Sequence, residues 1–107
     1  MVRGEVVRLA APRRARGHEQ RGARPAVVVQ ATELLELSTV LVAPTSRSAA
    51  PATFRPTIEL GGTPTHVLTD QVRVIDAAAV KASLGHLDTG EMAAVDDALA
   101  LVLGLAA

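Results

Sequence analysis

Phe54 is the single aromatic residue in this 107-residue chain, which contains neither Trp nor Tyr. Because apolar residues make up 49% of the sequence, the core has to be built from Val, Leu, Ile and Ala. A chain of this length holds one ordinary core, so we expect a single domain over residues 1–107. The scarcity of aromatic side chains also excludes a platform on which nucleic-acid bases stack.

Other absences narrow the possible chemistry. The chain has no cysteine, which excludes disulfides, zinc–thiolate sites and cysteine catalysis. Its histidines (His18, His66 and His86) are too far apart in sequence to form a metal-binding motif. The longest uncharged apolar run, residues 98–107, is about half the length of a membrane-spanning helix, and no signal peptide is recognisable. We therefore expect a cytoplasmic protein without membrane contact, metal or cofactor.

Short β-strand patterns come first along the chain. Continuous runs of β-branched and other apolar residues predict buried strands, and alternation of apolar with polar residues predicts half-buried ones. Residues 31–38 could form either a helical turn or a packed loop. We expect Pro44 to end the strand at residues 39–43. The predicted strands are residues 5–10, 26–30, 39–43, 54–60 and 66–75.

The C-terminal part of the chain predicts helices. Asp76 is in position to cap a short helix that Gly85 ends. Asp88, followed three residues later by Glu91, forms a capping-box pattern before a second helix. The apolar stripe of that helix consists of Met92, Val95, Leu99 and Val102. Strands followed by helices predict a mainly β, α+β fold: a small, strongly bent sheet or barrel with helices laid on it.

Positive charge is concentrated at the N-terminal end. Residues 1–30 carry seven Arg against two Glu, a net charge of +5, whereas residues 76–107 carry one Lys against five acids, a net charge of −4. Within residues 12–24, which read as a loop, five arginines lie close together. They form either a solvated charged surface or a surface that binds phosphate groups. These arginines are Arg13, Arg14, Arg16, Arg21 and Arg24.

Three polar features beside the predicted strands are candidates for function. Arg24 precedes Pro25, which favours an extended backbone next to a buried strand, so we expect this arginine to be held in place. Strand parity places Asp70 on an apolar face, where its carboxylate needs a partner: either a structural ion pair with an arginine or a functional site. Thr45 and Ser46 follow a buried strand, where their hydroxyls either act on a ligand or bond the strand end.

Several motifs occur along the chain in the order found in one group of bacterial toxins. They are RGEVV (3–7), GHEQ (17–20), RPAVVV (24–29), VAPTS (42–46) and DQVRVID (70–76), followed by a matching C-terminal segment. Together they resemble the MazF/PemK/Kid-type toxins, which are endoribonucleases of toxin–antitoxin pairs. The resemblance spans nearly the whole chain.

The resemblance implies an SH3-like small β-barrel of the MazF/PemK/CcdB toxin type, usually as a homodimer. It implies sequence-specific, metal-independent cleavage of single-stranded RNA, in which the ribose 2′-OH attacks the neighbouring phosphorus and leaves 2′,3′-cyclic phosphate and 5′-OH ends. Such cleavage inhibits translation and growth. It further implies a cognate MazE-like antitoxin, whose acidic or amphipathic tail would lie over the basic loop and exclude RNA.

The resemblance also implies roles for individual residues. Arg24 matches the family's catalytic Arg before Pro and would stabilise charge on the phosphoryl oxygens. Thr45 matches the catalytic Thr, a hydroxyl donor to the same oxygens. Glu19 would be a base or hold Arg24, and Asp70 matches the acidic residue before Gln. The expected RNA contacts are Arg13, Arg14, Arg16, His18, Gln20, Arg21, Ser46 and Gln71.

Two departures from the family pattern keep alternatives open, one of them Val7, which stands where the family usually carries an aromatic residue. Leu68 stands where some relatives carry a catalytic Arg. The resemblance therefore assigns the catalytic roles mainly to Arg24 and Thr45. One alternative is a non-catalytic toxin on the same fold that binds a protein target, and another is an antitoxin-binding homologue with weak activity. The apolar tail at residues 102–107, without aromatic or charged residues, disfavours the first. The intact set of predicted catalytic residues disfavours the second.

Overall fold

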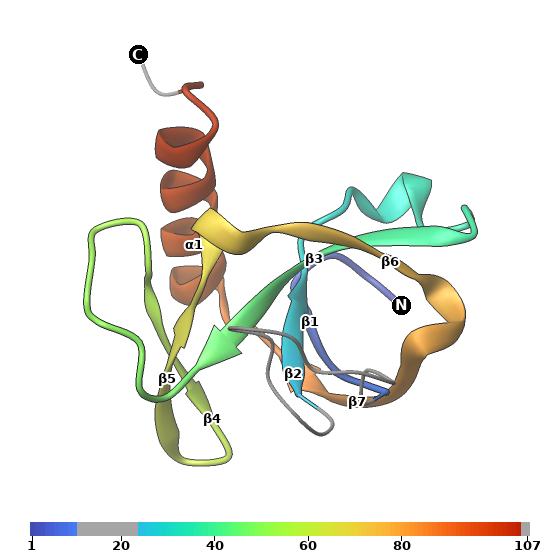
Figure 1. Cartoon of the computed structure of the whole chain (residues 1–107), viewed down its shortest axis with the longest axis horizontal. Coiled ribbons are helices and arrows are strands. Elements are labelled where there is room, and N and C mark those ends of the chain that lie inside the picture. The colour runs from blue at the N-terminus through green and yellow to red at the C-terminus, as the bar shows by residue number, and fades with distance from the viewer. Residues whose placement is uncertain (11–23, 106–107) are drawn as a thin grey trace, which may run out of the picture.

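The computed structural model describes residues 1–10 and 24–105. These residues form seven strands, three short 3-10 turns and one α-helix (Figure 1). The strands are β1 (Glu5–Leu9), β2 (Pro25–Val28), β3 (Thr39–Ser46), β4 (Thr57–Leu60), β5 (Thr63–Val67), β6 (Arg73–Asp76) and β7 (Val80–His86). The helix is α1 (Thr89–Val102), and the turns are η1 (Thr32–Leu34), η2 (Thr69–Gln71) and η3 (Ala77–Ala79). The prediction of a mainly β fold is confirmed, with one C-terminal helix in place of several. This helix falls short of the length and apolar character needed to cross a membrane, as do the other helical segments of the described chain.

The long strand β3 organises the sheet. The strands follow the order β4-β5-β3-β2-β1-β7, and every pairing among them is antiparallel. One edge of β3 pairs with β2, while the other edge pairs with β6 along its first half and with β5 at its end. In Figure 1, β3 accordingly runs diagonally through the molecule, with β5 beside its arrowhead. Strand β3 therefore brings together segments that are far apart in sequence.

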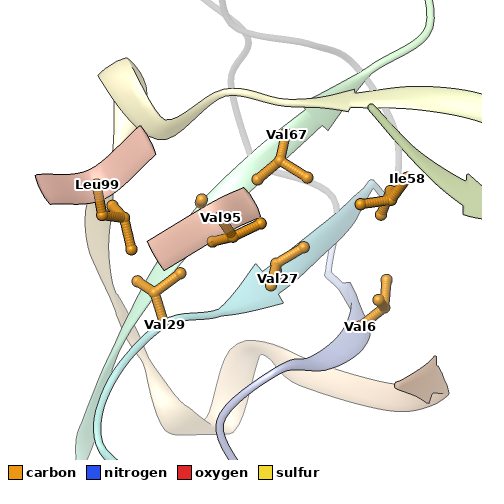
Figure 2. Close-up of a cluster of buried hydrophobic side chains, with 8 residues drawn as sticks. Val6, Val27, Val29, Ile58, Val67, Val95 and Leu99 are labelled. Carbon is orange, nitrogen blue, oxygen red and sulfur yellow. The ribbon is translucent and has the colours of Figure 1, made fainter. Parts of the chain in front are cut away.

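The bent sheet buries a separate apolar cluster on each face. The first cluster lies under α1, and Figure 2 shows Val95 and Leu99 of the helix over Val27 of β2 and over Val29, which follows this strand. Its members are Val6, Val27, Val29, Ala43, Ile58, Val67, Val95 and Leu99. The second cluster consists of Val7, Leu9, Ala26, Val28, Val40 and Val42. Both are aliphatic, which confirms the core predicted from composition.

The capping box predicted for α1 is present. The Asp88 carboxylate accepts a hydrogen bond from the Glu91 N–H at 2.7 Å, and the Glu91 carboxylate accepts one from the Asp88 N–H at 3.0 Å. The second Glu91 oxygen accepts the Glu59 N–H at 2.8 Å, which ties β4 to the start of the helix. In the predicted stripe, Val95 and Leu99 are buried, Met92 is half-buried and Val102 is exposed.

Strand β3 does not end at Pro44 as predicted. It continues to Ser46, and Pro44 pairs with Ala26 of β2. A proline lacks only the N–H donor, and the Pro44 carbonyl still accepts a hydrogen bond from the Leu68 N–H at 2.8 Å. This extension carries Thr45 and Ser46 into the sheet.

Residues 66–75 do not form one strand, because the turn η2 separates β5 from β6. Within this turn the buried Thr69 hydroxyl donates to the Phe54 carbonyl, which ties η2 to the segment before β4. Asp70 is consequently exposed in a turn, and its predicted position on an apolar strand face is wrong. The predicted strand 54–60 likewise begins only at Thr57, because the Arg55 N–H closes a turn onto the Ala52 carbonyl at 2.9 Å.

The helix predicted after Asp76 is also wrong. Asp76 does cap a turn, since its carboxylate accepts the Ala78 N–H at 2.9 Å, but η3 gives way after three residues to β7. Strand β7 covers the free edge of β1. Gly85, with φ of 128°, lies where the register between these strands shifts, which is a position for a bulge and not for a helix end.

Candidate functional site

The predicted site residues divide between two parts of the chain. Arg13, Arg14, Arg16, His18, Glu19, Gln20 and Arg21 lie outside the described residues, and their roles stay predictions. The structure describes Arg24, Thr45, Ser46, Asp70 and Gln71. Of these, the first three lie around the junction of β2 and β3, while Asp70 and Gln71 belong to η2.

Arg24 is anchored through its backbone immediately before β2. Its carbonyl accepts the Leu9 N–H of β1 at 3.0 Å, and the following Pro25 pairs with Arg8. The residue itself is exposed. The backbone of Arg24 is therefore held by a hydrogen bond to β1, and whether its guanidinium acts on a ligand stays a prediction.

The Thr45 hydroxyl is buried and forms a hydrogen bond within the protein. Thr45 is 2% exposed, and its Oγ1 donates to the Pro25 carbonyl at 2.9 Å. It pairs with Val67, which belongs to the cluster under α1. Because a hydroxyl has one hydrogen, this bond leaves Thr45 no donor for a ligand. The side chain instead ties the Arg24–Pro25 junction to β3.

Ser46 lies on the opposite face of β3 from Thr45, because successive side chains alternate along a strand. Ala26 pairs with Pro44, so the same antiparallel register continued by two residues sets Arg24 opposite Ser46. The Ser46 Oγ accepts the Ser48 N–H at 3.2 Å and the Ala49 N–H at 3.0 Å. These bonds use acceptor sites of the Ser46 hydroxyl, and the residue is 7% exposed. By the continued register, Ser46 and not Thr45 is the hydroxyl on the side of Arg24.

Asp70 forms a two-point ion pair with Arg55. The Arg55 Nε donates to Oδ1 at 3.1 Å and Nη2 donates to Oδ2 at 2.9 Å. The remaining Nη1 donates to the Ala50 carbonyl at 3.2 Å, and the guanidinium lies 5.7 Å from the centre of the Phe54 ring. These hydrogen bonds hold the pKa of the Asp70 carboxyl below its ordinary value. Of the two interpretations left open by the sequence, this geometry is that of the structural ion pair, which secures the segment before β4.

His66 is brought to the site although the sequence did not single it out. It pairs directly with Ser46 across β3 and β5, and the two side chains share a face. Its Nδ1 lies 3.4 Å from the Arg55 carbonyl oxygen and 3.3 Å from the Thr57 hydroxyl. A lone histidine in a short strand gives no sequence signal, and its position beside Ser46 depends on the β3–β5 register.

A cavity of about 460 Å³ elsewhere in the molecule contains none of these residues. It lies between the start of β1, the end of β7 and α1, where Arg3 forms an ion pair with Asp96 at 2.7 Å. Over the described ranges 1–10 and 24–105, no cluster of three or more potential ligand residues is arranged to hold a metal ion.

Comparison with known proteins addresses the family directly. Residues 2–103 match the family model of the PemK-like, MazF-like toxins of type II toxin–antitoxin systems. A candidate toxin of Mycobacterium tuberculosis is 45% identical over 106 residues, covering 98% of this chain and 99% of the relative.

Two solved structures share the fold. A mycobacterial endoribonuclease, determined in complex with its cognate antitoxin, superposes with a TM-score of 0.84 at 18% identity, covering 100% of this chain and 98% of that protein. MazF of Deinococcus radiodurans gives a TM-score of 0.78 at 28% identity, covering 97% of this chain and 96% of that protein. The mainly β architecture with a C-terminal helix is therefore that of MazF structures.

Proposed function

This chain belongs to the PemK-like, MazF-like toxins of type II toxin–antitoxin systems, and we propose that it is a sequence-specific endoribonuclease acting on single-stranded RNA without a metal ion. In the proposed reaction the ribose 2′ oxygen bonds to the adjacent phosphorus and the bond from phosphorus to the 5′ oxygen breaks. The products carry 2′,3′-cyclic phosphate and 5′-OH ends. Cleavage of cellular RNA in the cytoplasm would stop translation and growth.

The observation that carries this proposal is the exposed Arg24, whose backbone carbonyl is bonded to the Leu9 N–H of β1. Negative charge grows on the non-bridging phosphoryl oxygens as phosphorus becomes five-coordinate, and fixed donors stabilise that charge. An arginine presents a planar pair of donors that matches two phosphate oxygens. In this proposal the exposed Arg24, on its anchored backbone, and the hydroxyl of Ser46, which is 7% exposed in β3, supply these donors.

Thr45 and Asp70, which the sequence analysis places among the catalytic residues, support the site in this proposal. Thr45 fixes the Arg24–Pro25 junction through its bond to the Pro25 carbonyl. Asp70 fixes Arg55 and the segment that precedes β4. Glu19 keeps its predicted role as a base or as a partner of Arg24, and Gln71 its predicted contact with RNA.

The proposal includes a MazE-like antitoxin and a homodimer. An antitoxin partner is supported by the mycobacterial endoribonuclease of the same fold, which was solved with its cognate antitoxin. The arginine-rich segment at residues 13–24 is the predicted surface for which RNA and an acidic antitoxin tail would compete. Exposed leucines at the end of α1, Leu101, Leu103 and Leu105, provide apolar surface of the kind that a second copy buries.

The direct test is digestion of a long single-stranded RNA by the purified protein in EDTA, followed by mapping of the fragment ends. We expect discrete cuts at a shared short sequence, with 2′,3′-cyclic phosphate on one side and 5′-OH on the other. A requirement for a divalent ion would overturn the metal-independent mechanism. Absence of any cleavage, with growth still inhibited on expression, would favour a toxin that acts by binding a protein target.

A further inference from the structure

Ser46 pairs with His66 on one side of β3, and Arg24 lies directly before β2 on the other side. The β2–β3 pairs end at Ala26 with Pro44, and the same register continued by two residues would place Arg24 opposite Ser46. Neighbouring strands are about 4.8 Å apart, so the backbones of Arg24 and His66 are separated by roughly 10 Å across Ser46. A phosphodiester held over Ser46 by Arg24 is thus within reach of an imidazole on the other side.

The Nδ1 of His66 faces two oxygen atoms. The Arg55 carbonyl oxygen at 3.4 Å is an acceptor only, whereas the Thr57 hydroxyl at 3.3 Å can donate or accept. Arg55 is itself held by the two bonds to Asp70 and by the bond to the Ala50 carbonyl. With Nδ1 beside these two oxygens, Nε2 is the ring nitrogen that we assign to the substrate. The Asp70–Arg55 pair thereby orients the imidazole as well as securing its own segment.

Among the residues that the structure describes here, the other polar groups are poor proton donors; His18 and Glu19 lie outside those residues. Arginine stays protonated at any physiological pH, which excludes Arg24 and Arg55. The hydrogen bonds from Arg55 lower the pKa of the Asp70 carboxyl, so at neutral pH this group has no proton to give. A serine hydroxyl is too weak an acid. An imidazole, by contrast, changes its charge between pH 5 and 8.

We propose that His66 is the general acid of the cleavage, a role that rests on the endoribonuclease function proposed above. As the 2′ oxygen bonds to phosphorus and the bond to the 5′ oxygen breaks, the Nε2 proton of the imidazolium passes to the departing 5′ oxygen. The product is a 5′-OH and a neutral imidazole, which takes up a proton from water before the next turnover. The proton of the 2′-OH leaves to solvent.

A leaving-group substitution separates this role from a structural one. Once a cleavage site has been mapped, two short RNAs containing it are compared: one natural, and one with sulfur in place of the bridging 5′ oxygen. A thiolate is a much weaker base than an alkoxide and departs without protonation. The variant is His66→Asn, whose amide nitrogen can keep the bond to the Arg55 carbonyl. His66→Gln serves as a second variant, and thermal unfolding checks that both fold.

We expect His66→Asn to cleave the natural RNA about 10²–10⁴-fold more slowly than the wild type, and the sulfur RNA within about tenfold of the wild type. His86→Gln, at the exposed histidine of β7, is the matched control and should leave both rates unchanged. Equal losses on the two RNAs, in folded protein, would show that His66 only positions other groups and would overturn the proposal. If no cleavage site can be mapped because the wild type does not cut RNA, the endoribonuclease function itself fails.

Discussion

The Thr45→Val substitution distinguishes a buried structural hydroxyl from one that acts on RNA. Valine has nearly the shape of threonine but removes the donor that bonds the Pro25 carbonyl at 2.9 Å. Thr45 is 2% exposed, so water does not readily replace that donor. A buried group left without its partner costs about 1–3 kcal/mol. For a chain of this size each kcal/mol lowers Tm by about 4–8 °C, so a fall of roughly 5–20 °C follows.

The assay pairs thermal unfolding, followed by circular dichroism, with single-turnover cleavage of RNA at 25 °C. Thr45→Ser is the matched control for Thr45→Val, since it retains the hydroxyl and loses only a methyl group. Ser46→Ala is measured alongside. We expect Thr45→Val to lose more stability than Thr45→Ser while cleaving within about tenfold of the wild type. Ser46→Ala should lose about 10²-fold or more in rate, as is typical for removal of a donor to a developing oxyanion.

The opposite pattern would refute this reasoning. If Thr45→Val has the Tm of the wild type and loses about 10²-fold in rate, its hydroxyl acts on RNA directly. Ser46→Ala would then cleave at the rate of the wild type. That result would return the catalytic hydroxyl to Thr45, as the family resemblance implies, and would require the bond to Pro25 to break when RNA binds.

Three further predictions concern the scaffold. Glu91→Ala removes the capping box and the bond to β4, and should lower the free energy of unfolding by about 0.5–2 kcal/mol relative to wild type; an unchanged urea midpoint would contradict it. Ile58→Ala should cost about 2–5 kcal/mol and Ile58→Val about 0.5–1.5 kcal/mol, because Ile58 is 1% exposed in the cluster under α1; equal urea midpoints for the two would contradict it. Since the pKa of Asp70 is lowered on folding, its contribution to stability is present above about pH 4 and is lost as the pH falls below that value. Asp70→Asn should therefore reduce the difference between the free energies of unfolding at pH 7 and pH 3. An unchanged difference would show that the ion pair contributes nothing to stability.

The sequence predicts the elements that depend on local pattern. The valine runs of β1 and β2 and the capping box at Asp88 act over a few residues, and each forms where its pattern lies. The extension of β3 depends instead on the bond from Leu68 to the Pro44 carbonyl, which joins residues far apart in sequence. Strand β7 depends in the same way on the edge of β1. The residues within and around β3 and β7 do not predict these distant partners.

The same division applies to the candidate site. The held backbone of Arg24 follows from its neighbour Pro25, so sequence alone predicts it. The choice between Thr45 and Ser46 depends on the register of β2 against β3, because a shift by one residue exchanges the two faces. His66 enters only through the register of β3 against β5. Sequence motifs therefore locate the site, and strand pairing decides which side chains share it.

The most direct test of the central claim is the cleavage rate of Arg24→Ala in EDTA. Arg73→Ala, at an exposed arginine of β6, is the control for loss of one positive charge. The account predicts that Arg24→Ala keeps the Tm of the wild type and cleaves RNA at least about 10²-fold more slowly, whereas Arg73→Ala cleaves within a few-fold of the wild type. A folded Arg24→Ala protein that cuts RNA at the rate of the wild type would contradict the account.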